Sequence, residues 1–305
     1  MTIERRVVEG AAAGPTLLIT GGVHGDEFEP MKAVRTLIQD FHDEKARDRL
    51  RGKLVLAPIV NFPAFLNGRR TAADDGLDLA RTCPGDPAGG TTERIAAELT
   101  SLIGTADYYI DLHTGGIEMS VYPLAGYSLH PDPDVLAKQR GMARAFNLSL
   151  VWGTSPELEG RSLSVARDAN VPAIYTEHHG SGFCREEGVR DYVEGCYNVM
   201  AYLDMIDQQP SPSRIRYEVE DDRPASGHLQ ICNPAPRTGF FEPLVALGDK
   251  VRVGDPLGHV FDTCGDDRQP VLSQQRGVVI VVRTFSRVRE GESVGVILEI
   301  PEESR

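Results

Sequence analysis

The sequence predicts an α/β fold, in which a mainly parallel or mixed sheet is flanked by helices and is followed by a small C-terminal all-β domain. Over the first two thirds of the chain, short apolar runs alternate with amphipathic stretches, which is the pattern of βαβ units. After residue 208, short β-type runs are separated by Gly-Asp and Gly-Glu turns, which favours a small barrel or sandwich. We therefore predict a large domain at residues 1–208 and a small β-barrel or sandwich domain at residues 209–305.

The elements of the large domain follow from the spacing of its apolar residues. The predicted strands are short apolar runs at residues 15–20, 53–60, 108–112, 148–151 and 173–176. Apolar residues recur at helical spacing at residues 31–41 and 95–103, which predicts a helix at each place. A last helix is predicted at residues 186–207, and the segment QQPSPSR after it is interpreted as a linker because it is rich in proline and serine.

The charge of the chain excludes some classes of partner. A formal net charge of −13 repels phosphate backbones and anionic membrane surfaces, so neither nucleic acid nor membrane is an expected partner. The chain has no apolar run of about 18 residues, and the N-terminus MTIERRVVEG lacks the apolar core of a signal peptide. We expect a cytoplasmic protein that acts on a small molecule.

The cysteines argue against a disulfide framework and against a thiolate metal site. They are scattered, odd in number and form no CxxC pair, at Cys83, Cys184, Cys196, Cys232 and Cys264. Nitrogen and oxygen must therefore bind any metal that the protein holds.

A histidine and a glutamate in the segment TLLITGGVHGDEFEP have the spacing of metal ligands. His24 and Glu27 follow an apolar strand and a glycine pair, and residues three apart on a turn can aim at one point. A lone HxxE pattern is weak evidence, because it is also found in ordinary surface turns. It needs a partner from elsewhere in the chain.

The segment ADYYIDLHTGG supplies that partner. Asp111 and His113 end a second apolar strand and point to the same face, because side chains alternate along a strand. Ligands in open α/β sheets gather at the carboxyl ends of strands. His24, Glu27 and His113 would form a two-histidine, one-carboxylate zinc site with a fourth position for water or substrate, which is typical of a catalytic site. For Asp111, a hydrogen bond to the ring of His113 and a turn-stabilising role are equally open.

Zinc-dependent hydrolysis also needs a proton acceptor and a cation for the oxyanion. Glu177 ends the apolar run VPAIYTE and is the candidate base, against the alternative of an ordinary solvated glutamate. The loop NFPAFLNGRRTAADDGLDLART contains the candidate cations, Arg70 and Arg81, because a guanidinium binds carboxylates and polarised carbonyls.

Four segments in this order resemble the succinylglutamate desuccinylase/aspartoacylase family, which belongs with the zinc carboxypeptidases. They are GGVHGDE, the run from Asn61 through RRT to DLAR and PGD, DLHTGG, and GRSLSVARDANVPAIYTEHHG, and the likeness covers roughly residues 15–200. The resemblance implies a zinc carboxypeptidase-like fold with one Zn²⁺ per chain.

The resemblance also assigns roles to residues. It implies that His24, Glu27 and His113 bind the zinc ion and that Glu177 is the general acid/base. It further implies that Arg70 polarises the scissile carbonyl. Arg81 would bind a carboxylate of the substrate.

The chain departs from the family pattern at some positions. Ala80 stands where DLNR is usual, so an amide donor for the substrate carboxylate is absent. His178 and His179 stand where glycines are common, and a role in the pocket and a plain loop role are equally open. The longer loop GRRTAADDGLDLARTCPGD looks closer to the branch that deacetylates N-acetylated diamino acids. The C-terminal module resembles a biotinyl/lipoyl-type barrel, but Lys250 is not in an attachment motif.

Our hypothesis is a zinc-dependent amidohydrolase of amino acid metabolism, acting on linear amides other than peptide bonds. It would hydrolyse the amide bond of an N-acyl amino acid, as a deacylase or deacetylase, with metal-activated water and Glu177 as general acid/base. Two alternatives stay open: a metallo-carboxypeptidase that acts on short peptides, and a catalytically silent homologue that binds a metabolite. The sequence does not identify the acyl group or the amino acid of the substrate. It also leaves the oligomeric state open, and a homo-oligomer is one of the possible states.

Overall fold

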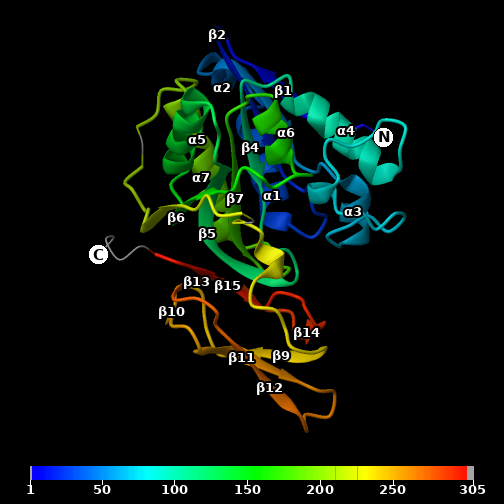
Figure 1. Ribbon diagram of the computed structural model, residues 1–305. Coiled ribbons are helices and arrows are strands. Elements are labelled where there is room, and N and C mark those ends of the chain that lie inside the picture. Colours follow the sequence, from blue (N-terminus) through cyan, green and yellow to red (C-terminus); the bar gives the residue numbers. More distant parts are fainter. Residues whose placement is uncertain (1, 210, 225, 301–305) are drawn as a thin grey trace. The chain divides into compact units, whose positions relative to one another are not determined.

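The computed structural model describes residues 2–209, 211–224 and 226–300. The described residues form two compact units (Figure 1). The N-terminal unit comprises the chain up to Thr114, together with Pro123–Glu177 and Gly182–Ser226. The C-terminal unit comprises Gly115–Tyr122, His178–Ser181 and the chain from Gly227 onward.

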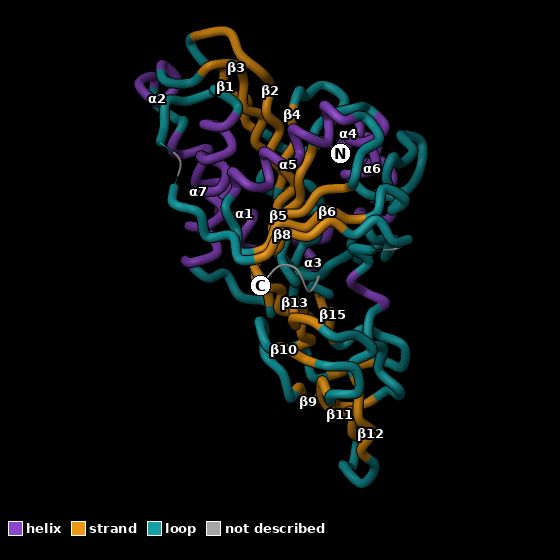
Figure 2. The backbone as a smooth tube through the Cα atoms, turned by 60° about the vertical axis from the view of Figure 1, so that its left-hand side comes forward, coloured by secondary structure: helices purple, strands orange, loops and turns teal. Residues whose placement is uncertain are grey.

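A mixed sheet forms the centre of the N-terminal unit, with the strand order β1-β3-β2-β4-β7-β5-β6-β8. Its strands are β1 (Arg6–Glu9), β2 (Ala12–Thr20), β3 (Arg51–Ala57), β4 (Tyr108–Leu112), β5 (Met119–Ser128), β6 (Leu150–Thr154), β7 (Ala173–Gly180) and β8 (Tyr217–Glu220). Strand β2 is parallel to β3 and β4, and β4 is parallel to β7. Strands β5, β6 and β8 are also mutually parallel along their pairings, whereas β1 pairs with β3 in the antiparallel sense (Figure 2).

Helices cover both faces of this sheet (Figure 1). They are α1 (Phe28–Asp40), α2 (Glu44–Asp48), α3 (Phe62–Asn67), the short 3₁₀ helix η1 (Leu79–Arg81), α4 (Thr91–Ile103), α5 (Pro133–Phe146), α6 (Ser162–Asp168) and α7 (Glu186–Tyr202). Apolar residues of α1, α5 and α7 share one core cluster with Leu17 and Ile19 of β2. Residues of α4 and α6 share the other with Leu18. Consecutive residues of β2 therefore enter opposite cores, which explains its unbroken apolar run.

The predicted strands and helices of the N-terminal unit are present, with shifted ends in most cases. The largest difference concerns the helix predicted at residues 186–207, since α7 ends at Tyr202. Asp204 adopts a left-handed conformation with φ of 57°, and Met205 N donates to Met200 O at 2.8 Å. This Schellman-type ending closes the helix one turn early. The sequence pattern did not predict strands β1, β5 and β8 or helices α2, α3, α5 and α6.

The C-terminal unit consists mainly of antiparallel strands. They are β9 (Gly239–Pro243), β10 (Lys250–Val251), β11 (Pro256–Phe261), β12 (Arg268–Leu272), β13 (Gly277–Arg283), β14 (Arg287–Val288) and β15 (Gly295–Leu298), and a 3₁₀ helix, η2, spans Leu229–Ile231. Strands β12, β11, β9 and β14 form one antiparallel sheet in that order. Strand β13 pairs with β15, with β10 and with the first residues of β5. The predicted fold class, an α/β sheet with a further all-β part at the C-terminus, is confirmed.

The segment after α7 packs within the N-terminal unit before the chain changes units. Of the predicted linker, Pro210 lies outside the described residues, and Arg214 N donates to Asn147 Oδ1 at 2.8 Å. Strand β8 then pairs with β6. The N-terminal unit therefore extends to Ser226, and the chain enters the C-terminal unit at Gly227. The division into a catalytic domain of residues 1–208 and a β domain of residues 209–305 stays a prediction about function. Among the described residues, no helix is long and apolar enough to cross a membrane.

Candidate metal-dependent active site

The turn between β2 and α1 positions His24 and Glu27. A Cβ at Gly25 would lie 2.0 Å from the carbonyl carbon of Ala64, so the backbone of this turn packs directly on the backbone of α3. Only glycine permits that approach, and it fixes the residues on either side. His24 and Glu27 are 3% and 1% exposed. Glu27 directly precedes α1, where the helix dipole favours a negative charge.

His113 reaches the same place from β4. Strands β2 and β4 pair in parallel with Thr20 opposite Asp111, so the residues that follow the two strands are neighbours. Glu27 Oε1 lies 2.8 Å from His24 Nδ1, and Glu27 Oε2 lies 3.0 Å from His113 Nδ1. One ligand atom from each of the three residues lies within 4.8 Å of the others. The structure therefore brings together the three side chains that the sequence predicted as metal ligands.

The opposite ring nitrogens show which atoms can bind a metal. His24 Nε2 lies 3.1 Å from Asp78 Oδ1, and His113 Nε2 lies 3.1 Å from Asp111 Oδ2. A carboxylate accepts a hydrogen from each Nε2, which leaves the Nδ1 lone pairs directed at Glu27. Two lone pairs facing a carboxylate repel it unless positive charge lies between them. A proton on each imidazole, or one cation shared by all three groups, satisfies this arrangement, and two nitrogens with one carboxylate suit zinc.

The pKa values of His24, Glu27 and His113 also indicate that their surroundings favour a positive charge at this place. Burial by itself would lower the pKa of His113, but Asp111 and Glu27 outweigh it and raise the pKa well above its usual value. The pKa of His24 is also raised, because Glu27 and Asp78 together outweigh burial and the charge of Arg70. Burial would raise the pKa of Glu27, yet the two imidazoles lower it.

Asp111 is anchored from two further directions. Thr20 Oγ1 donates to Asp111 Oδ1 at 2.7 Å, and Ser162 Oγ donates to Asp111 Oδ2. Asp111 is fully buried. Its carboxylate therefore contacts side chains from β2 and from the start of α6, in addition to the ring of His113. These contacts favour the orienting role over a turn-stabilising one.

The two predicted arginines lie at different depths. Arg70 is half-buried, and its Nε and Nη2 lie 3.0 and 2.9 Å from Asp78 Oδ2. Its Nη1 is 3.4 Å from His24 Nδ1, so Arg70 directly contacts one of the three candidate ligands. Arg81, the last residue of η1, is exposed and donates to Ala80 O at 2.6 Å. Partial burial, with the charges of Arg161 and Arg70, lowers the pKa of Arg81 to about 10.

Arg161 is a candidate that sequence reasoning missed. It is half-buried directly before α6, and burial lowers its pKa. Its pKa is also affected by the charges of nearby groups, namely Tyr175, Arg70, Asp78 and Glu177. Arg161 therefore belongs to the same cationic group as Arg70 and Arg81. The available signal was its place in GRSLSVARDANVPAIYTEHHG, where it is the first arginine.

Glu177 lies in β7, near the candidate ligands. Burial raises its pKa, the carboxylate of Glu27 raises it further, and the charges of His113, His24 and Arg70 oppose both, with a resulting pKa of about 7. Its Oε2 is buried and makes no hydrogen bond with the described residues. A buried carboxyl group with a pKa near neutrality can accept and return a proton at physiological pH.

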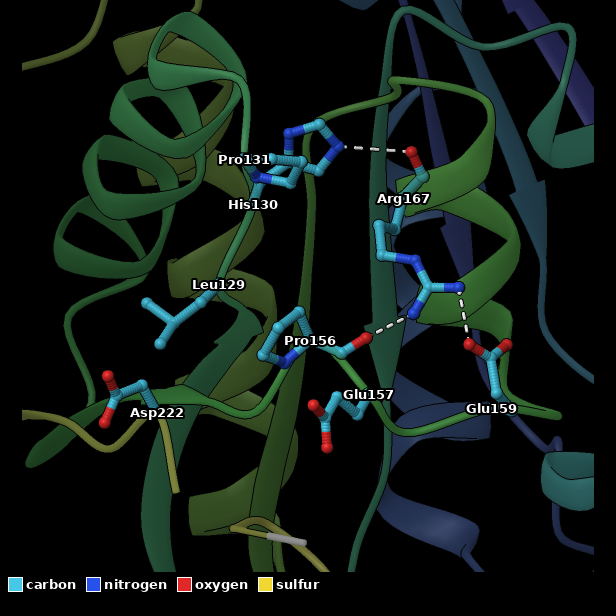
Figure 3. Close-up of a pocket in the computed structure, with 8 residues that line it drawn as sticks. All are labelled: Leu129, His130, Pro131, Pro156, Glu157, Glu159, Arg167 and Asp222. Carbon is cyan, nitrogen blue, oxygen red and sulfur yellow. Dashed lines mark hydrogen bonds and ion pairs between the residues drawn. The ribbon is translucent and has the colours of Figure 1, made fainter. Parts of the chain in front are cut away.

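Two other predicted features are also located. Ala80 N donates to Asp78 Oδ1 at 3.0 Å, so residue 80 contributes its backbone, and its methyl side chain offers no amide. In the C-terminal unit, the rings of His178 and His179 meet edge to face with centroids 4.6 Å apart. A pocket of about 590 Å³ in the N-terminal unit is lined by none of the predicted site residues (Figure 3). Its lining comes from the segments that follow β5, β6 and β8 and from Arg167 of α6.

The chain is similar to known proteins over most of its length. The model of the succinylglutamate desuccinylase/aspartoacylase catalytic domain matches residues 13–203. The chain is 31% identical to the N-α-acetyl-L-2,4-diaminobutyric acid deacetylase of Halomonas elongata over 298 residues, which cover 95% of this chain and 83% of the relative.

Solved structures show the same fold. A succinylglutamate desuccinylase/aspartoacylase from Rhodobacter sphaeroides superposes with a TM-score of 0.85 at 29% identity, covering 97% of this chain and 89% of that one. The product-bound ectoine utilization protein EutE from Ruegeria pomeroyi superposes with a TM-score of 0.84 at 27% identity, covering 97% and 88%. The chain therefore belongs to the succinylglutamate desuccinylase/aspartoacylase family.

Proposed function

We propose that the protein is a zinc-dependent hydrolase that cleaves the amide bond of an N-acyl amino acid. The observation that carries this proposal is the position of the Glu27 carboxylate, 2.8 Å from His24 Nδ1 and 3.0 Å from His113 Nδ1. Both histidines have their other ring nitrogen against a carboxylate, which is the usual environment of metal-binding imidazoles.

His24, Glu27 and His113 would hold one zinc ion through two nitrogens and one carboxylate. A zinc ion held there would supply Lewis acidity, which would polarise the scissile carbonyl and lower the pKa of the attacking water toward about 7. The three protein ligands leave room for a further ligand, as catalytic rather than structural sites do.

Glu177 would move the proton. With a pKa of about 7, its carboxylate is partly ionised at neutral pH and can accept a proton from the attacking water. The same carboxyl group then returns the proton to the nitrogen of the leaving amine, which would otherwise leave as an anion. Its buried Oε2, without a hydrogen bond among the described residues, is suited to this exchange because no other donor holds it.

The arginines would bind and polarise the substrate. Arg70 lies 3.4 Å from His24 Nδ1, so it borders the point where the scissile carbonyl would develop negative charge. A well-placed donor of this kind lowers the activation free energy by on the order of 3 kcal/mol. The charge of Arg161 lowers the pKa of Arg81, so the two guanidinium groups are near enough to each other to bind one substrate carboxylate together in this proposal. An acidic protein needs such a local positive region to attract an anionic substrate.

The relatives narrow the substrate to acylated amino acids. One relative is named as a deacetylase of N-α-acetyl-L-2,4-diaminobutyric acid, and another is a succinylglutamate desuccinylase from Burkholderia orbicola that is 32% identical over 124 residues. The first covers 95% of this chain, so we favour an N-acetyl amino acid over an N-succinyl one.

The test is a substrate panel with zinc-loaded protein. N-acetyl-L-2,4-diaminobutyrate, other N-acetyl amino acids, N-succinylglutamate and short peptides are compared by the release of free amine. We expect turnover of an N-acetyl amino acid and of no peptide. Cleavage of peptides alone would replace the proposal by a carboxypeptidase, and near-stoichiometric zinc without any turnover would indicate a metabolite-binding homologue.

A further inference from the structure

The segment Gly160–Arg161–Ser162 touches both parts of the proposed site. At its first residue, Gly160 has a φ of +78°, and a Cβ there would lie 2.6 Å from Arg81 O. Cys83 N donates to Gly160 O at 3.0 Å. Residue 160 is therefore packed against the backbone that carries Arg81, and only a residue without a side chain fits.

At its last residue, the segment reaches the partner of a candidate metal ligand. Ser162 Oγ donates to Asp111 Oδ2, and this carboxylate oxygen of Asp111 lies 3.1 Å from His113 Nε2. Asp111 Oδ1 is held separately by Thr20 Oγ1 at 2.7 Å, which in turn is 2.8 Å from Tyr109 OH. All members of this network are buried, so water does not replace a bond that is lost.

We propose that Ser162 is a positioning residue that couples zinc binding at His113 to substrate binding at Arg161 and Arg81. The inference rests on the proposed function. Ser162 acts through Asp111: its hydroxyl fixes the carboxylate that orients the imidazole of His113. Because Ser162 directly follows Arg161, a shift of the arginine toward a substrate is transmitted to the Asp111 carboxylate. Coupling of this kind is reciprocal, so bound substrate strengthens the binding of zinc, and bound zinc strengthens the binding of substrate to the same degree.

Ser164 provides a matched control on the same helix. It is also buried, at 4% exposure against 6% for Ser162. Its Oγ donates to Arg161 O at 2.7 Å and accepts from Arg161 N at 3.0 Å. It thus supports the start of α6 without a bond to Asp111. Both Ser162→Ala and Ser164→Ala remove a hydroxyl group from the start of α6. Of the two, Ser162→Ala alone removes a hydrogen bond to Asp111.

The experiment measures the zinc dissociation constant of metal-free full-length protein by competition with a chromophoric chelator. Loss of the direct partner of a metal ligand weakens metal binding about 10- to 100-fold. Ser162 acts one contact further out, through Asp111, so we expect Ser162→Ala to raise the zinc dissociation constant by about tenfold, the lower end of that range. Ser164→Ala should leave it within about twofold. The KM for N-acetyl-L-2,4-diaminobutyrate, at saturating zinc, should rise in Ser162→Ala. Thermal unfolding of the metal-free variants tells a general loss of stability from a specific loss of zinc affinity.

A double-mutant cycle tests the route through Asp111. If Ser162 acts through that carboxylate, Ser162→Ala adds little to the zinc dissociation constant once Asp111→Asn is present. Additive effects of the two changes would overturn the inference. Ser162→Cys, which keeps a weak donor in nearly the same volume, gives an intermediate zinc dissociation constant and serves if the alanine variant does not fold.

The outcomes separate the inference from the proposed function. If the unmodified protein binds zinc and turns over substrate, and Ser162→Ala changes neither constant, the inference alone is wrong. If the unmodified protein binds no zinc, both fail. An equal effect of Ser162→Ala and Ser164→Ala on zinc binding would assign Ser162 a structural role only.

Discussion

Two clusters of carboxylates in the N-terminal unit differ in the cations that face them. At β8, Glu220 accepts two hydrogen bonds at 2.7 Å from Arg140 and one at 2.6 Å from Tyr127. Its neighbour Glu218 pairs with Arg144. At the candidate active site, Glu27 faces two imidazoles instead, and each imidazole has a second carboxylate behind it.

The difference lies in which protons can be exchanged. An arginine stays protonated at any physiological pH, so the β8 cluster is a fixed set of ion pairs that ties a strand to helix α5. An imidazole can lose its proton, and a metal ion can take the place of the protons that His24 and His113 share with Glu27. Similar pairing of charges thus stabilises structure at one place and allows chemistry at the other.

Removal of a candidate ligand is the strongest test of this contrast. His24→Ala should release zinc, with an affinity loss greater than the roughly 10- to 100-fold expected for an outer-shell change. Metal analysis of the purified variant measures it. Glu220→Gln is the matched control and should keep its zinc, because its partners are Arg140 and Tyr127. Unchanged zinc content in His24→Ala would remove His24 from the site.

Proton transfer can be separated from metal binding at Glu177. Glu177→Gln keeps the shape of the side chain but cannot accept a proton, so we expect hydrolysis to fall by about 10²- to 10⁴-fold. Zinc content should stay unchanged, since Glu177 is not among the candidate ligands. Paired measurements of kcat and metal content decide the outcome. Normal turnover in this variant would exclude Glu177 as the general acid/base.

Zinc affinity should depend on pH at the active site. The pKa values of His24 and His113 are raised, so in the metal-free protein protons compete with zinc until the pH rises above those values. Affinity therefore falls as the pH falls, by roughly tenfold per pH unit for each displaced proton. Calorimetry in buffers of different ionisation enthalpy counts the released protons. Zinc binding without proton release would contradict the assignment of these two imidazoles.

The sequence predicted those parts of the molecule that depend on strand ends. His24 and His113 each follow an apolar run, and parallel strands bring their carboxyl ends to one edge, so their meeting followed from pattern alone. Asp78 could not be found in this way. It lies 54 residues from His24 in a loop without periodicity, and only the folded path of that loop brings it to Nε2.

The unpredicted elements have equally local causes. Strand β5 reads MSVYPLAGYS, and its internal proline and glycine are signals against a strand. For Arg161 the spacing of residues gave no signal, and only its place at the start of the motif GRSLSVARDANVPAIYTEHHG could have singled it out. The roles of Glu177, Arg70 and Arg81 stay predictions until variants are measured.

The smallest expected effect concerns the β8 cluster. Hydrogen bonds from Arg140 lower the pKa of Glu220. A lowered pKa means that ionised Glu220 contributes stability above its unfolded pKa, and that this contribution is lost as the pH falls through the folded pKa. The side chains of Arg140 and Glu220 are each about one-third exposed, so solvent weakens the attraction between their charges. We therefore expect Glu220→Gln to lower the free energy of unfolding by about 1 kcal/mol near neutral pH.

Urea unfolding at about pH 7 and at about pH 3 measures this cost. The difference between Glu220→Gln and the unmodified protein should be smaller at the lower pH, because the contribution of ionised Glu220 is lost as the pH falls through its lowered folded pKa. Glu218→Gln is the control, and its cost should be smaller because, among the described residues, Arg144 is the single side chain that pairs with Glu218, which is also slightly more exposed than Glu220. A pH-independent cost for Glu220→Gln would mean that shape, and not charge, holds β8 in place. The two clusters would then differ in more than the exchange of protons.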